Sequence, residues 1–339
     1  MNQTSSKSKR IPALDFTKGA LVLIMVLYHW INYFWGSQDN RYLRFLTPSF
    51  IFISGFIISN IYLSKYSISD PQLPKRLVER GLKILGVFIV LNLARNLFAP
   101  GRSPQHESAV LLPIGRLVDI YITGSGGGNG QAKVIAFFIL LPISYLLLLS
   151  ALLVIVSRLY KYTMHVAGAL ALICVAFCYA RGFDVPNLEL LAIGLLGVLA
   201  GYLPIEKVNS AVSHPYLLAV AYALYLGAIS IWNVPFPLQV VGVYLSLMIL
   251  YLLGQKSGEP GRIRAWVVLL GKYSLFGYIV QIAILQVLHA GMKRIESQAV
   301  VLGLSFVLAF ALTVVSVEIL DRMRAYFKPI DRAYRAVFA

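Results

Sequence analysis

Ten long apolar segments constrain the fold of this chain more than any other feature of its sequence. A membrane core about 30 Å thick needs about 20 predominantly apolar residues per helical span, whereas outer-membrane strands alternate apolar and polar residues over about ten positions. The chain therefore reads as an all-α integral membrane protein, a bundle of about ten transmembrane helices. The expected spans are 19–36, 45–64, 82–99, 134–157, 163–181, 187–204, 215–232, 235–254, 266–290 and 299–320.

The composition agrees with a chain whose main partners are membrane lipids. Hydrophobic residues make up 58% of it and charged residues 13%, with a mean hydropathy of +0.75. In soluble domains about a quarter of the residues are charged. The formal net charge of +16 is explained by the loops between spans, so no nucleic-acid partner is expected.

The basic residues predict the orientation of the bundle. If the N-terminus is cytoplasmic, 21 of the 30 Lys and Arg residues fall on the inner side and nine outside. This bias matches the positive-inside rule, with both termini cytoplasmic, as in a multi-pass protein of a bacterial inner membrane. One domain covers 1–339: a cytoplasmic N-terminal tail at 1–17, an outer loop at 100–133 and a basic cytoplasmic tail at 321–339.

The two cysteines, Cys174 and Cys178, lie one helical turn apart within one expected span. No histidine or acidic residue lies close enough in the sequence to complete a metal site, so packing explains them and no metal is expected.

A stripe of helical spacing runs along the first expected span and holds most of its polar residues. An ionisable group at bilayer depth is costly and is by default a candidate functional group facing the protein interior. The stripe consists of Asp15, Lys18, Val22, Met25, His29 and Asn32.

His29 is the candidate general base of this stripe. It lies eleven residues beyond Lys18, about 16 Å along a helix. An imidazole, with an unperturbed pKa of about 6.5, can take a proton from a hydroxyl or an amine. Asn32 is expected to orient a substrate, and Lys18, held by Asp15, to meet a phosphate group. The alternatives are a buried histidine bonded to a helix neighbour and a simple i,i+3 ion pair between Asp15 and Lys18.

Two further segments supply possible partners. In the second span Ser54 and Gly55 reach about the depth of His29, where small residues also serve close helix packing. In the ninth span Ser274, Tyr278 and Gln281 share one face, and a buried amide is costly unless it is partnered. Gln281 is therefore expected to face the first two helices.

These motifs resemble the transmembrane acyltransferase superfamily, which includes the acyltransferase-3 family and the heparan-α-glucosaminide N-acetyltransferase-like proteins. The resemblance rests on Arg10-Ile-Pro-Ala-Leu14-Asp15-Phe-Thr-Lys18-Gly19 ending at Tyr28-His29, on Pro48-Ser49-Phe50-Ile51-Phe52-Ile53-Ser54-Gly55-Phe56, and on Leu270-Gly271 with Ser274, Tyr278 and Gln281. The matches follow the expected order over most of the chain.

The resemblance implies transfer of an acyl group, commonly acetyl, from cytosolic acyl-CoA to a hydroxyl or amine of an envelope carbohydrate or glycolipid. His29 matches the family's catalytic histidine. Lys18 stands where acyltransferase-3 members place an arginine, and it cannot make the bidentate contact of a guanidinium. Gln281 stands where many members have a second histidine.

The expected mechanism uses acyl-CoA as a co-substrate, with no bound cofactor. Its phosphates would meet Lys18, Arg76, Lys83 and Lys272, while Ser54, Ser274 and Tyr278 line the tunnel that leads to His29, Asn32 and Gln281. Direct transfer and a route through acyl-histidine both remain open. The alternative function is a transporter or flippase for a small polar or sugar-linked solute, although no repeat between the two halves of the sequence supports it.

Overall fold

The computed structural model describes residues 11–36, 41–98, 119–124, 137–232, 234–256 and 261–338. Within these ranges every regular element is helical and no strand occurs, which confirms the all-α prediction. The chain forms two compact units, Met1–Phe50 with Ile205–Ala336 and Ile51–Pro204 with Val337–Ala339.

Long apolar helices confirm an integral membrane protein but not the count of ten spans. Among the described residues, seven helices are long and apolar enough to cross a membrane, or eight if α7 (Pro186–Ala200) and α8 (Ile205–Ala211) form one broken span. The seven are Pro12–Trp35, Arg41–Leu63, Leu140–Ser157, Thr163–Ala180, Phe236–Lys256, Ser274–Gly291 and Gln298–Tyr326.

Four expected spans differ from the structure for physical reasons. The span 187–204 is α7, which ends at Ala200 after 15 residues. The expected span 215–232 is α9, which has only 17 residues. The span 82–99 is the second half of α3, whose first half is rich in charged residues. The span 266–290 is not one helix, because the backbone leaves helical geometry at Tyr273 (φ −112°, ψ 28°).

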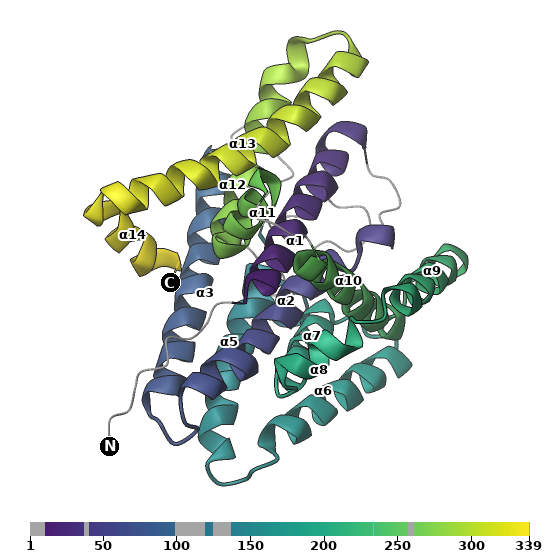
Figure 1. Ribbon diagram of the computed structural model, residues 1–339, viewed down its shortest axis with the longest axis vertical. Coiled ribbons are helices and arrows are strands. Elements are labelled where there is room, and N and C mark those ends of the chain that lie inside the picture. The colour runs from purple at the N-terminus through teal and green to yellow at the C-terminus, as the bar shows by residue number, and fades with distance from the viewer. Residues whose placement is uncertain are drawn as a thin grey trace. The chain divides into compact units, whose positions relative to one another are not determined.

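The first unit is built around α1. Its elements are α1 (Pro12–Trp30), η1 (Ile31–Trp35), η2 (Arg41–Leu43), the first turn of α2 (Leu46–Ile57), α8 (Ile205–Ala211), α9 (Pro215–Ile231), α10 (Phe236–Lys256), α11 (Arg262–Lys272), α12 (Ser274–Gly291), η6 (Met292–Arg294), α13 (Gln298–Tyr326) and α14 (Lys328–Phe338) as far as Ala336. Helix α1 packs against α10, α11, α12 and α13, and all of these lie around it in Figure 1.

Two glycines set the closest of these packings. A Cβ atom at Gly19 of α1 would collide with the backbone of Val267 in α11, and one at Gly271 would collide with the carbonyl group of Asp15. The two backbones therefore touch directly, as they do wherever small residues line a helix crossing. Gly19 and Gly271 thus have a structural role, whatever Lys18 and Lys272 beside them do.

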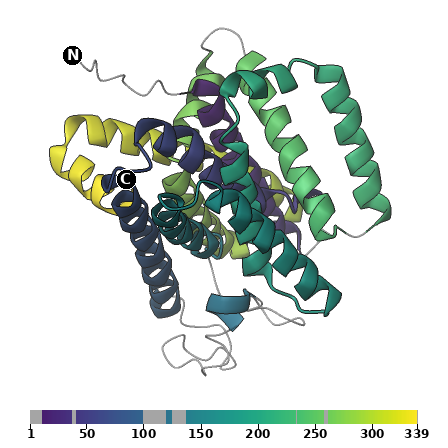
Figure 2. The same ribbon diagram turned by 90° about the horizontal axis from the view of Figure 1, so that it is seen from below.

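The C-terminal end of α1 is held by a second set of contacts. Trp30 Nε1 donates a 2.9 Å hydrogen bond to Ser305 Oγ of α13, and both residues are buried. Val26 and Leu285 pack in the same apolar cluster. Helices α9 and α10 form a hairpin at the edge of the unit and lie side by side in Figure 2.

The second unit is a smaller bundle. It contains the rest of α2, η3 (Ile58–Leu63), α3 (Gln72–Phe98), η5 (Asp119–Thr123), α5 (Leu140–Ser157), α6 (Thr163–Ala180) and α7 (Pro186–Ala200). Gly55 and Gly197 bring α2 and α7 into backbone contact, which confirms that small residues of the second span serve close packing. Cys174 and Cys178 lie on α6 as free thiols.

The predicted loop and tails lie only partly within the described residues. Most of the outer loop 100–133 lies outside them, except for 119–124, where Asn187 of α7 donates to the carbonyl groups of Ile120, Tyr121 and Ile122 at 3.3 Å each. Helix α1 begins at Pro12 and α13 continues to Tyr326, so helical structure extends into both segments that were predicted as tails.

The glycine contact between α1 and α11 yields a prediction. We expect Gly271→Ala to lower the melting temperature of the purified protein. The added methyl group has no space, and overpacking costs about 1–3 kcal/mol, more than the roughly 0.5–1 kcal/mol that alanine gains over glycine in a helix.

The matched control is Gly303→Ala in α13, because no atom lies within 4 Å of a Cβ added there. This variant should melt at or above the wild-type temperature in the same thermal scan. Equal melting temperatures for the two variants would contradict the close contact.

Candidate functional site

The polar stripe of α1 lies on the inward face of the first unit. Val22 and Met25, in the middle of the stripe, are 0% and 2% exposed. Val22 packs with Leu270 of α11 and Tyr273. The central turns of the stripe therefore face α11 and α12. This agrees with the prediction, made from the ionisable residues of the stripe, that it faces the protein interior.

His29 lies in a partly buried position against aromatic rings. Its ring centroid is 6.4 Å from that of Tyr278 in α12 and 5.2 Å from that of Tyr28. Its Nε2 atom is shielded from solvent. The imidazole thus lies between two helices of the unit, a position in which a base can act away from bulk water.

Gln281 is the third polar residue on the facing sides of α1 and α12. We call His29, Tyr278 and Gln281 together the His29 cluster. Tyr278 contacts His29, and Leu285 packs with Trp30, so the face of α12 that carries both residues points toward α1. Gln281 lies between them on that face, since steps of three and four residues keep one side of a helix. This supports the expectation that Gln281 faces the first helix.

The amide of Gln281 is the most costly group of the cluster. The residue is 0% exposed, and neither Nε2 nor Oε1 has a hydrogen-bond partner among the described residues. An amide buried without a partner costs about 1–3 kcal/mol on protein scales. A ligand that offers a donor and an acceptor would recover this energy.

The opposite end of the stripe, here called the Lys18 end, is a set of ion pairs. Lys18 Nζ lies 2.6 Å from Asp15 Oδ1, and Lys272 Nζ lies 2.7 Å from Asp321 Oδ1 of α13. The phenol of Tyr273 donates to the same Asp321 atom at 2.5 Å, and burial raises the pKa of this phenol. The two lysines of the first unit that were predicted to meet phosphate, Lys18 and Lys272, therefore already have carboxylate partners, and the i,i+3 pair of Asp15 with Lys18 is present.

Two other predicted residues of the first unit are Asn32 and Ser274. Asn32 is in the π-helical turn η1, and its side chain is exposed. Ser274 begins α12 and is half-buried near Tyr273.

The remaining predicted residues belong to the second unit. Ser54 is half-buried in α2, next to Gly55 at the contact with α7. Arg76 of α3 is exposed, with its guanidinium 4.8 Å from the ring centroid of Tyr66. Lys83 is half-buried on the same helix.

One residue of the first unit was missed by the sequence analysis. His289 of α12 has ring contacts with Tyr33 and Phe34 of η1, with centroids 5.8 and 5.6 Å apart. It continues the spacing of Tyr278, Gln281 and Leu285, and this signal was available in the sequence. The polar face of α12 therefore extends about 12 Å beyond Gln281, at a rise of 1.5 Å per residue.

The arrangement allows acid–base chemistry and hydrogen bonding. The His29 cluster offers an imidazole, a phenol and an amide, while ionic groups are gathered at the Lys18 end. Within the described ranges, no three His, Cys, Asp or Glu side chains come together as a metal site.

Comparison with known proteins identifies a domain type. The family model described as an acyltransferase domain, of the acyltransferase-3 family, matches residues 11–319. No curated protein and no solved structure matches the chain.

The amide of Gln281 yields a stability prediction. We expect Gln281→Met to raise the melting temperature of the purified protein, because a side chain of similar size removes a buried amide that has no partner. Thermal unfolding followed by tryptophan fluorescence measures this. A fall in melting temperature would show that the amide is stabilised by a bond that the structure does not contain.

Proposed function

The chain belongs to the acyltransferase-3 family and is a membrane acyltransferase, and from that premise we propose that it transfers an acyl group from cytosolic acyl-CoA. The group transferred is acetyl, and the acceptor is a hydroxyl or an amine of a carbohydrate or glycolipid of the cell envelope. The membrane proposed is the bacterial inner membrane, with both chain termini in the cytoplasm, as the positive-inside bias indicates.

The observation that carries the proposal is the His29 cluster in the interior of the first unit. His29 acts as general base: its imidazole takes the proton of the acceptor as the acceptor's lone pair attacks the thioester carbonyl carbon. The carbon–sulfur bond then breaks, and the thiolate of coenzyme A leaves with the proton from the imidazolium. Transfer through acyl-histidine uses the same residue and the same overall balance.

Gln281 and Tyr278 support this chemistry with hydrogen bonds. The amide N–H of Gln281 and the phenol of Tyr278 are donors on the face of α12 that points toward His29. Donors placed where negative charge develops on the carbonyl oxygen commonly supply a large share of the catalysis of acyl transfer. Asn32 and His289 lie farther along the unit, where we assign them to orienting the acceptor.

The charged residues of the Lys18 end are assigned to the donor. Lys18 and Lys272 would each exchange a carboxylate partner for a phosphate of acyl-CoA, which keeps their charge neutralised in both states. Ser274 is assigned to the lining of the donor path, and the roles predicted for Arg76, Lys83 and Ser54 of the second unit stay predictions.

Replacement of His29 tests the assignment of the base. Purified wild-type protein incubated with labelled acetyl-CoA and mixed glycans should form acylated product. His29→Ala should lower the rate about 10²- to 10⁴-fold, because that is the usual contribution of a positioned general base.

His214→Ala is the control for the loss of a histidine, since His214 is exposed just before α9. It should keep the wild-type rate. Product formation by His29→Ala at the wild-type rate would contradict the role of His29. Movement of a solute without consumption of thioester would favour the transporter instead.

Replacement of Gln281 separates its catalytic from its structural role. Gln281→Met, expected to be the more stable variant, should transfer acetyl at least about tenfold more slowly, because a lost hydrogen bond of about 1.4 kcal/mol corresponds to that factor. Gln281→His restores a donor and should recover most of the rate in the same assay. Equal rates for all three proteins would exclude the amide from the reaction.

A further inference from the structure

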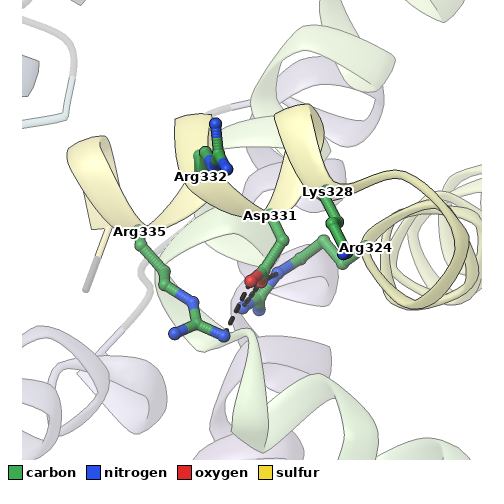
Figure 3. A pocket seen from close by; sticks show the side chains of 5 residues that line it. All are labelled: Arg324, Lys328, Asp331, Arg332 and Arg335. Carbon is green, nitrogen blue, oxygen red and sulfur yellow. Dashed lines mark hydrogen bonds and ion pairs between the residues drawn. The ribbon is translucent and has the colours of Figure 1, made fainter.

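The end of α13 and the start of α14 form a corner closed by ion pairs. The guanidinium of Arg324 donates to Asp331 Oδ1 with Nε at 2.9 Å and with one terminal nitrogen at 2.5 Å. Arg335 approaches the other carboxylate oxygen of Asp331 at 2.7 Å. Figure 3 shows both arginines converging on this carboxylate.

Aromatic contacts join this corner to the Lys18 end. The guanidinium of Arg324 lies 3.9 Å from the ring centroid of Tyr334 and 5.3 Å from that of Tyr273. The two tyrosine rings pack edge to face at 5.4 Å. Helix α14 is therefore held against the junction of α11 and α12, where the polar face of α12 begins.

A pocket of about 250 Å³ opens at the corner, lined by Arg324, Lys328, Asp331, Arg332 and Arg335. These side chains are drawn in Figure 3. Four of the five are cationic at neutral pH and one is a carboxylate. Hydrogen bonding from Arg324 holds the pKa of Asp331 below its usual range, so the carboxylate is ionised. The pocket thus carries a formal excess of three positive charges.

Ion pairs within the described residues neutralise only part of this positive charge. Arg324 and Arg335 share Asp331, whereas Lys328 and Arg332 have no ion-pair partner within the described part of the chain. Residues 328, 332 and 335 lie on successive turns of α14, where like charges repel each other. An anion in the pocket would relieve this repulsion.

We propose that this pocket binds a phosphate group through Lys328, Arg332 and Arg335. Arg332 and Arg335 offer planar N–H pairs that match phosphate oxygens, and Lys328 offers a compact positive charge. Arg324 and Asp331 have a positioning role, because their ion pair fixes α14, whose three cations line the pocket.

Two phosphate sources reach this end of the first unit. If the proposed function holds, the nucleotide phosphates of acyl-CoA arrive beside Tyr273, one residue before the polar face of α12. The headgroup of an anionic phospholipid is the other source, because α14 directly follows a helix long enough to span the membrane. The two share the same chemistry and are separated by the experiment.

The test measures the melting temperature of the full chain in non-ionic detergent during titration with two probes. One probe is adenosine 3′,5′-bisphosphate, and the other is phosphatidylglycerol added against a phosphatidylcholine background at constant ionic strength. We expect at least one probe to raise the melting temperature of the wild type. The double variant Lys328→Gln with Arg332→Gln should bind that probe at least tenfold more weakly.

Two control variants separate the pocket from general charge. Lys207→Gln with Arg262→Gln removes one lysine and one arginine at exposed positions on α8 and α11, and it should bind the probe like the wild type. Lys328→Arg with Arg332→Lys keeps both charges and should retain most of the affinity.

A rise in melting temperature with the nucleotide alone assigns the pocket to the acyl donor. A rise with the lipid alone assigns it to a lipid headgroup, and a rise with both probes shows that the pocket accepts either phosphate. Each of these outcomes supports the proposal if the double variant loses the rise. No response in the wild type, or an unchanged response in the double variant, overturns it. Acetyl transfer is measured in a separate assay. A phosphate-dependent rise in melting temperature without acetyl transfer refutes only the proposed function. Acetyl transfer without such a rise refutes only the phosphate-binding role of the pocket.

Discussion

The direct backbone contact between α1 and α11 is the constraint on which the first unit depends. Gly19 and Gly271 leave no space for a side chain where the two helices meet. This contact fixes the rotation of α1 about its own axis, so that Val22 is buried against α11 and α12. His29, two turns beyond Val22 with a helix of 3.6 residues per turn, is thereby directed to Tyr278. A methyl group at either glycine would collide with the backbone of the other helix and would change this orientation of α1.

The His29 cluster retains a polar group that stability alone would not select. Gln281 is completely buried, and its amide lacks a partner within the described residues. Cores tolerate volume-conserving apolar replacements well, so an apolar side chain would fit this position at a lower free energy. A buried amide without a partner, on the helix face that also carries Tyr278, is the kind of local inconsistency expected at functional sites.

Electrostatics divides the first unit into two regions with different requirements. Around His29 the groups are neutral donors and acceptors, which can be buried without a counter-charge. At the Lys18 end both carboxylates, Asp15 and Asp321, have a lysine partner. At the corner formed with α14 the cations that line the pocket outnumber the single carboxylate, Asp331, and for this reason an additional anionic ligand is proposed there.

The sequence by itself determined the all-α class, the membrane location, the inward stripe of α1 and the shared face of Tyr278 and Gln281, because periodicity and hydrophobicity are local properties. The acyltransferase family was also recognisable from short motifs. Only the tertiary structure decided which charges are neutralised, since Lys272 pairs with a carboxylate 49 residues away. It also decided the break at Tyr273 and the corner at Asp331. These depend on contacts between helices that are distant in the sequence, and no pattern within a single segment specifies them.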